Sequence, residues 1–298
     1  IFSSVGNGLI QTLILGQLLR WHAPPSTLTL TYMLATLPGF IGSYLGERLC
    51  RRVSPLRLLL LSELAGMMAL LLPAYGLMAH STPSLLALQS IEALLAGLSW
   101  PAMSLLFKRG LSATELPAAT AMETVIFASQ VLLGTGIGVL LFDRVSPVTL
   151  LCAAAASFLL SAVFLLFAMR CLGPRDQEPD KQSAAPTALR WHALSRLQKR
   201  SLLLLPALAA VGAPAMALLP ALAQQIRPDE TTGLALPLIF ARSVGQLCGP
   251  LLLNADRLGD YARSNRYLLG CLLLFLGAYA VLPTFSAYRS AALLMIFV

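Results

Sequence analysis

The sequence predicts an all-α integral membrane protein, and three observations lead to this class. Hydrophobic residues make up 57% of the 298 residues, and the mean hydropathy is +0.76. Charged residues make up only 11% of the chain, whereas a soluble domain carries about 25% and needs them to cover its surface. Apolar stretches of roughly 20 residues, the length that crosses a bilayer, recur along the whole chain.

These apolar stretches predict about nine complete transmembrane helices and a partial tenth. The short alternating runs of a membrane β-barrel are missing, so helices must satisfy the backbone hydrogen bonds in lipid. Because both ends of the sequence lie inside apolar stretches, we expect the chain to be a fragment of a longer protein. The predicted spans are 1–19, 27–46, 55–78, 83–107, 117–142, 147–169, 201–224, 234–253, 265–283 and 287–298.

The basic residues predict the orientation of the spans. If the residues before Ile1 are cytoplasmic, 16 of the 21 basic residues lie in inner connections and 4 lie in outer ones. Membrane proteins concentrate Lys and Arg in cytoplasmic loops, where these side chains face anionic lipid. The net charge of +8 is thereby explained by membrane topology, and we expect no nucleic-acid partner.

A polar segment divides the chain into regions. Residues 173–187 contain three Pro and are mostly polar, as in a solvated linker. Residues 188–200 predict a short amphipathic helix on the membrane surface, or a charged extension of the next span. We therefore predict a six-helix bundle at 1–170, a cytoplasmic linker at 171–200 and a truncated second bundle at 201–298. Two bundles joined in this way are typical of a transporter.

A pattern of small residues followed by an acid and Arg occurs after the second span and again after the eighth. Such residues at a helix end can form an ion-pair network between helices that stabilises one conformational state; alternatively, they only anchor the topology. The residues of this gating motif are Gly42, Glu47, Arg48, Arg51 and Arg52 in the first copy, and Asp256 and Arg257 in the second.

The gating motif resembles the signature of the major facilitator superfamily. Residues 2–8 and 107–121 are similar to segments of its drug and siderophore exporters. The resemblance implies a two-bundle fold with twelve spans in the inner (plasma) membrane. It further implies a monomer that exports a small amphipathic molecule, a drug or a siderophore, in exchange for protons by alternating access. The alternatives are uptake of a metal chelate or small metabolite, and a membrane scaffold or sensor that transports nothing.

Ionisable side chains inside the spans are candidates for ion or substrate binding, because a charge at this depth is costly unless it is paired or hydrated. Glu92 lies nine residues into its span, about 13 Å from the outer side, and is the first candidate for proton coupling or cation binding. The alternative is a hydrogen-bonded structural acid. Glu63 and Glu123 lie nearer to the inner ends, where they can also support the loop network.

Two further residues complete the candidate set. Arg242, inside the eighth span, can hold an anionic substrate, pair with an acid or extend to the interface. Asn7, between two Gly residues, can bind substrate but cannot carry a proton. Neither a phosphate-binding loop nor a nucleophile–base pair is present in the sequence, so we expect no enzymatic activity, no cofactor and no metal. Pro38 and Pro101 predict kinks in spans two and four.

Overall fold

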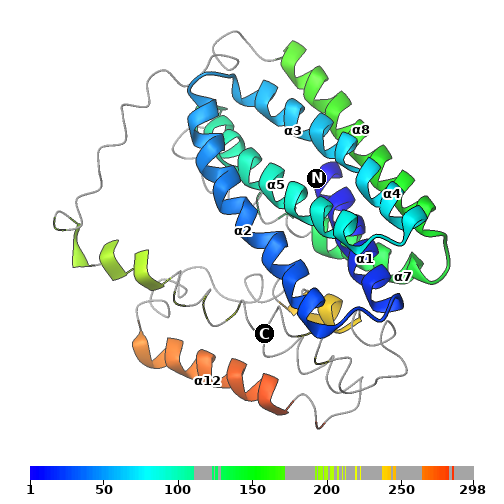
Figure 1. Cartoon of the computed structure of the whole chain (residues 1–298). Helices are drawn as coiled ribbons and strands as arrows, with labels where there is room; N and C mark the ends of the chain where they lie inside the picture. Colours follow the sequence, from blue (N-terminus) through cyan, green and yellow to red (C-terminus); the bar gives the residue numbers. More distant parts are fainter. Residues whose placement is uncertain are drawn as a thin grey trace. The chain divides into compact units, whose positions relative to one another are not determined.

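The computed structural model describes residues 1–110, 129–171 and 264–281, together with isolated residues elsewhere. Within these residues every regular element is helical (Figure 1). The elements are α1 (Phe2–Arg20), α2 (Pro25–Cys50), α3 (Pro55–Ala69), α4 (Leu71–Ala79), α5 (Thr82–Gly110), the π-helix η1 (Ser129–Thr135), α7 (Gly136–Phe142), α8 (Pro147–Cys171) and α12 (Asn265–Val281).

Four described stretches are long and apolar enough to cross a bilayer, and they match four predicted spans within a few residues. They are Pro25–Cys50, Pro55–Ala79, Thr82–Gly110 and Pro147–Cys171. Helix α1 agrees with the first predicted span, and α12 agrees with most of the ninth. Most of the predicted linker at 171–200 and most of the second bundle lie outside the described residues.

Local sequence accounts for where several helices begin. Ser54 and Ser146 each precede a Pro that occupies the first helical position, where no backbone N–H is needed. The Ser54 hydroxyl accepts a hydrogen bond from the Arg57 N–H at 3.4 Å, and the Ser146 hydroxyl accepts one from the Thr149 N–H at 3.2 Å. Such caps satisfy N–H groups that have no partner inside the helix.

Pro73 divides the third span, which is predicted as one helix. Helix α3 ends at Ala69 and α4 begins at Leu71, and the two follow one another along one line in Figure 1. Because Pro73 has no N–H, the Ala69 carbonyl loses its usual partner four residues on, and the Pro ring disfavours regular geometry there. By contrast, α2 and α5 continue as helices through Pro38 and Pro101.

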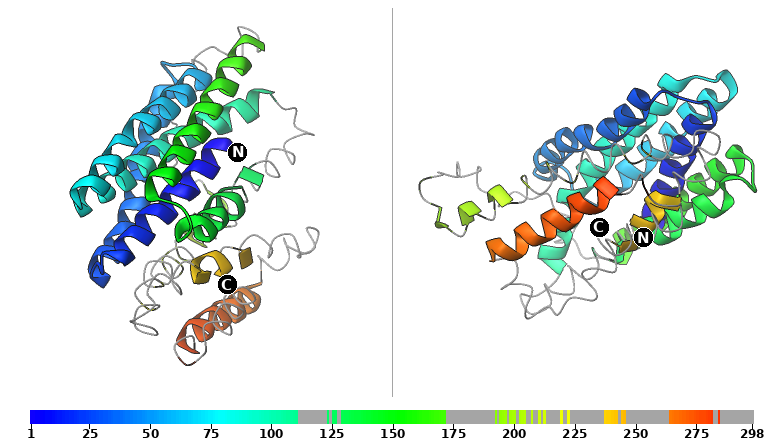
Figure 2. Two further views of the ribbon diagram at one scale, coloured as in Figure 1. Left: turned by 90° about the vertical axis from the view of Figure 1, so that its right-hand side faces the viewer. Right: turned by 90° about the horizontal axis from the view of Figure 1, so that it is seen from below.

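The described helices form two compact units, each of which is considered by itself. The first unit contains α1, η1, α7, α12 and the start of α8. Helix α1 runs beside η1 and α7, as the views in Figure 2 show for α7. Its apolar residues Ile10, Leu13, Ile14, Leu18 and Leu19 are at most 1% exposed. This helix is therefore buried within the first unit.

The second unit contains α3, α4, α5 and most of α2 and α8. Glycines allow α2 and α5 to pack closely and in parallel. A Cβ atom on Gly42 or on Gly97 would collide with the backbone of the facing helix, and one on Gly46 would lie 2.5 Å from the Leu98 carbonyl oxygen. The Ser43 hydroxyl donates to the Gly97 carbonyl at 3.2 Å across the same contact. Small residues at helical spacing are the usual means of such close approach in membranes.

Large apolar side chains remain exposed on the outside of the long helices. Phe40 on α2 is 70% exposed, and Phe167 on α8 is 64% exposed. Exposing so much apolar surface to water would cost free energy, whereas contact with lipid chains does not. The described helices therefore have the surface of transmembrane segments as well as the length.

Candidate functional site

Polar side chains gather where α3 and α5 face each other in the second unit. The hydroxyl oxygens of Ser62 on α3 and Ser99 on α5 lie 2.8 Å apart and share a hydrogen bond. Glu63 follows Ser62 along α3, and Glu92 precedes Ser99 on α5 by two helical turns. Two of the acids that the sequence analysis selects are therefore carried by one pair of packed helices.

Helix α8 provides a partner for Glu63. The Ser161 hydroxyl donates a hydrogen bond to Oε1 of Glu63 at 3.0 Å, and the two residues are 98 positions apart in the chain. A hydrogen bond to an ionised carboxylate is stronger than one between neutral groups. Ser161 therefore helps to fix the position of the Glu63 carboxyl group inside the bundle.

Glu92 points at the one place on this part of α3 that has no side chain. A Cβ atom built on Gly66 would lie 3.6 Å from Oε1 of Glu92 and 3.6 Å from the ring of Phe158 on α8. Oε1 of Glu92 is itself buried and has no hydrogen-bond partner among the described residues. Leaving a carboxylate oxygen without a partner in apolar surroundings is costly, so this oxygen is suited to receive a proton or a cation.

Both acids lie in the second unit, on α3 and α5. Two ionised carboxylates repel each other where the dielectric constant is low, and a proton on either of them removes this repulsion. We refer to Glu63, Glu92 and Ser161 as the acid pair site.

The sequence predicts both acids as candidates but not Ser161 and Gly66, the two residues next to their carboxyl groups. Ser161 and Gly66 are small residues inside apolar helices, where Ser and Gly are common and do not by themselves indicate a site. Only the packing of α3 against α5 and α8 reveals what they contact.

The first copy of the gating motif lies at the C-terminal end of α2. Glu47 and Arg51 form an ion pair of 3.2 Å, four residues apart, and the guanidinium group of Arg48 lies 4.5 Å from the centre of the Tyr44 ring. Arg52 is exposed, and Gly42 is buried against α5. The second copy, Asp256 and Arg257, is outside the described residues.

A cleft of about 570 Å³ opens beside this motif, between the ends of α2 and α5. Glu47 and Arg51 line it from the α2 side, and Ser104 and Lys108 line it from α5. The motif residues therefore share a polar cleft with a second helix, although the described ion pair joins two residues of the same helix end.

The remaining candidates lie in the first unit. Oδ1 of Asn7 on α1 is buried and lacks a hydrogen-bond partner among the described residues. Arg242 is only 3% exposed, so its charge lies inside the protein. Glu123 is half-buried.

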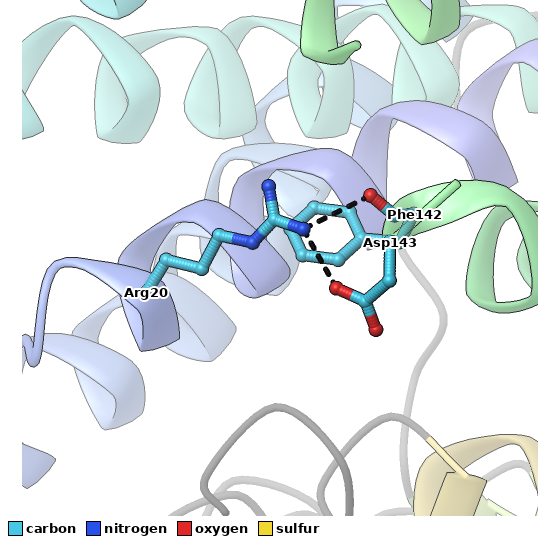
Figure 3. Close-up of polar contacts among 3 residues, drawn as sticks. All are labelled: Arg20, Phe142 and Asp143. Carbon is cyan, nitrogen blue, oxygen red and sulfur yellow. Dashed lines mark hydrogen bonds and ion pairs between the residues drawn. The ribbon is translucent and has the colours of Figure 1, made fainter. Parts of the chain in front are cut away.

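Arg20 joins the end of α1 to the end of α7 (Figure 3). Its guanidinium group donates to the Asp143 carboxylate at 2.6 Å and to the Phe142 carbonyl at 3.2 Å. The same group lies 4.2 Å from the centre of the Phe142 ring. One cation therefore makes an ion pair, a backbone hydrogen bond and a cation–π contact.

The Asp143→Asn substitution is expected to lower the free energy of unfolding by less than about 1 kcal/mol, because pairs of exposed charges contribute little. The two side chains are 36% and 66% exposed. Thermal unfolding in detergent at low and high salt measures this loss, and the difference from the native protein should shrink at high salt. A loss of several kcal/mol that is independent of salt would contradict this assessment.

The fold and this distribution of polar groups define a multi-pass helical membrane protein, as predicted. Its apolar helices expose apolar surface on the outside and carry a few ionisable groups at depth.

Comparison with known proteins identifies the family. The model of the Major Facilitator Superfamily matches residues 1–298. The chain therefore belongs to this family of secondary transporters, which are not enzymes, and the predicted all-α major facilitator class is confirmed. A curated protein of Pseudescherichia vulneris, "Uncharacterized 29.9 kDa protein in crtE 3'region", is 98% identical over 46 residues. This match covers 15% of the present chain and 17% of that relative's length.

Proposed function

We propose that this chain is part of a proton-coupled transporter of the inner membrane that exports a small amphipathic molecule, a drug or a siderophore, by alternating access. The substrate and the proton are its partners, the lipid bilayer is its environment, and one copy of the protein suffices. Family membership and the apolar helices support transport in general. Export and proton coupling rest on the resemblance of residues 2–8 and 107–121 to exporters and on one acid, Glu92.

The single observation that carries proton coupling is the setting of Glu92 inside α5. Its Oε1 is buried and has no hydrogen-bond partner among the described residues, and α5 is one of the helices that can cross a bilayer. An ionised acid in such a place is costly. A proton removes that cost, so binding and loss of a proton at Glu92 can change the stability of two conformations by different amounts.

This difference is what coupling requires. A ligand shifts a conformational equilibrium only by the difference between its affinities for the two states. If the protonated and ionised forms of Glu92 favour opposite orientations, the proton gradient drives the cycle, and the substrate moves in the other direction. Arg242 and Asn7, which lie in the first unit, are proposed as substrate contacts, and Glu123 as a second candidate for coupling.

The Glu92→Gln substitution tests the proposal, because Gln has nearly the same shape but cannot carry a proton. The full-length protein is reconstituted in liposomes with radiolabelled tetraphenylphosphonium, an amphipathic cation, as the probe. We expect the native protein to accumulate the probe only when a pH gradient is imposed, and Glu92→Gln to reduce accumulation to the level without a gradient. Asp143→Asn removes an exposed acid and should leave accumulation unchanged.

Three results would overturn parts of the proposal. Full gradient-driven accumulation by Glu92→Gln would exclude this residue as the coupling acid. Movement of a probe in the same direction as the protons would replace export with uptake, and the absence of any transport with drug-like, chelate and small-metabolite probes would favour a scaffold or sensor.

A further inference from the structure

We propose that the polar cleft between the ends of α2 and α5 is a binding site for one anionic phospholipid, whose phosphate lies between Arg51 and Lys108 and whose acyl chains lie along α2. The inference goes beyond the proposed function and does not depend on it, because it concerns a lipid that stays in the membrane and not the molecule that is transported. The residues that carry it all belong to the second unit.

The cleft opens where the close contact between α2 and α5 ends. Gly46 of α2 still packs on the Leu98 backbone of α5, and three residues further along α5 Pro101 lines the cleft. Because Pro101 has no N–H, the Gly97 carbonyl lacks its usual donor four residues on, and the Ser43 hydroxyl of α2 donates to it at 3.2 Å. The space beyond this contact, about 570 Å³, is within the range of sites that hold small molecules.

Two cations line the cleft from different helices. They are Arg51 on α2 and Lys108 on α5, and Glu47 is the one acid among the described lining residues. Glu47 lies 3.2 Å from an Nη atom of Arg51, whereas the Nε atom of Arg51 is buried without a hydrogen-bond partner among the described residues. Lys108 forms no ion pair with any residue that the structure describes. Since a guanidinium group has five N–H donors, Arg51 can bind a phosphate without releasing Glu47.

The charge of the cleft selects an anion. Two cations and one acid give the lining residues a net charge of +1. A further cation is close by, because the guanidinium group of Arg48 lies 4.5 Å from the centre of the Tyr44 ring, and Tyr44 lines the cleft. Phosphate oxygens accept short, charge-assisted hydrogen bonds from Arg and Lys. An amphipathic cation, by contrast, would be repelled from this place.

Exposed apolar side chains continue from the cleft along α2. Their spacing of three and four residues places them on one side of the helix, and they extend over 14 residues, about 21 Å. This exceeds half of the hydrocarbon thickness of about 30 Å, so an acyl chain can run beside them through its own leaflet. The residues of this apolar stripe are Leu30, Met33, Leu37, Phe40 and Tyr44, which are 42% to 70% exposed.

Tyr44 belongs to both the cleft and the apolar stripe, and this continuity favours a lipid over a soluble phosphate compound. The predicted topology places the cleft at the cytoplasmic boundary of the membrane, and basic sites between transmembrane helices on that side recognise anionic headgroups. A phosphate held by Arg51 and Lys108 joins two helices, whereas the Glu47–Arg51 ion pair lies within α2. We therefore expect the lipid to stabilise the folded protein, as does any ligand that binds the folded state alone.

The test measures lipid binding to the purified full-length protein in detergent. After removal of native lipid, the protein is titrated with dioleoyl phosphatidylglycerol, which is anionic, and separately with dioleoyl phosphatidylcholine, which has the same acyl chains but no net charge. Native mass spectrometry counts bound lipids, and thermal unfolding gives the melting temperature. We expect one phosphatidylglycerol to bind about tenfold more tightly than phosphatidylcholine, the factor for one charge-assisted contact, and to raise the melting temperature.

Lys108→Gln and Arg170→Gln are matched variants for the headgroup. Each removes one exposed cation near the end of its helix, but Lys108 lines the cleft and Arg170, on α8, does not. We expect Lys108→Gln to lose the preference of about tenfold for phosphatidylglycerol and Arg170→Gln to keep it. Lys108→Arg retains the charge and should retain the preference, so it separates a lost contact from a disturbed fold.

Phe40→Ala and Phe167→Ala are matched variants for the acyl chains. Both side chains are exposed, at 70% and 64%, but only Phe40 belongs to the apolar stripe. Phe40→Ala should weaken binding of phosphatidylglycerol several-fold, and Phe167→Ala should leave it at the native level. Equal affinities of these two variants would overturn the place assigned to the acyl chains.

Three further results would overturn the site. Equal affinity of the native protein for the two lipids would show that the cleft does not select an anion. Equal losses in Lys108→Gln and Arg170→Gln would indicate attraction to the whole basic surface. Inorganic phosphate that raises the melting temperature as much as phosphatidylglycerol would replace the lipid with a soluble phosphate compound. The proposed role of Glu92 is unaffected by each of these outcomes, since no transport is measured.

Discussion

Truncation of Phe142 to alanine is expected to lower the free energy of unfolding by about 4 kcal/mol, the range for a fully buried aromatic side chain. The ring is 1% exposed. It fills the space above Gly16, where a Cβ atom would lie 2.5 Å from a ring carbon, Cε2. The guanidinium group of Arg20 lies over the ring, 4.2 Å from its centre. The substitution removes both contacts and leaves a cavity that α1 and α7 cannot easily close.

Thermal and chemical unfolding in detergent measures this effect, and Phe167→Ala is the matched control. Phe167 is 64% exposed on α8, so the same truncation removes little packing inside the protein and should cost less than about 1 kcal/mol. Equal losses for the two variants would mean that Phe142 does not occupy the buried position that the structure assigns to it.

The substitution Gly42→Ala is expected to destabilise the contact between α2 and α5 by about 3 kcal/mol, the upper part of the range for overpacking. The added Cβ atom would collide with the Leu94 carbonyl oxygen and lie 3.0 Å from the Leu98 nitrogen. Both atoms belong to the backbone, so no side chain can rotate away. The helices must separate, and the Ser43–Gly97 hydrogen bond of 3.2 Å is lost with the close approach.

The control for Gly42→Ala is Gly270→Ala in α12. A Cβ atom on Gly270 meets no atom of the described residues within 4 Å, so only the intrinsic preference of Ala for a helix remains, a gain of about 1 kcal/mol. The two variants should therefore change stability in opposite directions. If Gly42→Ala is as stable as Gly270→Ala, the helices are not in backbone contact at Gly42.

Much of the fold follows from the sequence because it depends on local runs of residues. The predicted spans 55–78 and 147–169 match Pro55–Ala79 and Pro147–Cys171 closely, since a Ser–Pro pair marks each start and an apolar run sets each length. The division of the third span at Leu70 is missed. A Pro inside an apolar run has no consistent effect on a helix: Pro38 is accommodated in α2, and Pro73 is not accommodated in the third span.

The π-helix η1 is a second feature that the local sequence does not predict. It lies where α1 crosses it closely, and a Cβ atom on Gly8 of α1 would lie 2.7 Å from the Cα atom of Gly134. The Thr135 hydroxyl donates to the Gln130 carbonyl five residues back, at 3.4 Å. The wider turn of η1 accommodates the close approach of α1. The residues that form η1 do not by themselves predict it.

The sequence by itself determined that this protein is helical and lies in a membrane. It also determined which ionisable groups lie within the spans, because hydropathy and charge are properties of short segments. Only the tertiary structure decided what these groups contact. The Glu63 carboxyl group pairs with Ser161, 98 residues away, and Glu92 faces the bare backbone of Gly66. These contacts depend on how each helix is rotated about its axis and where it crosses its neighbours. That rotation is set by the packing of whole helix faces and is not encoded near either acid.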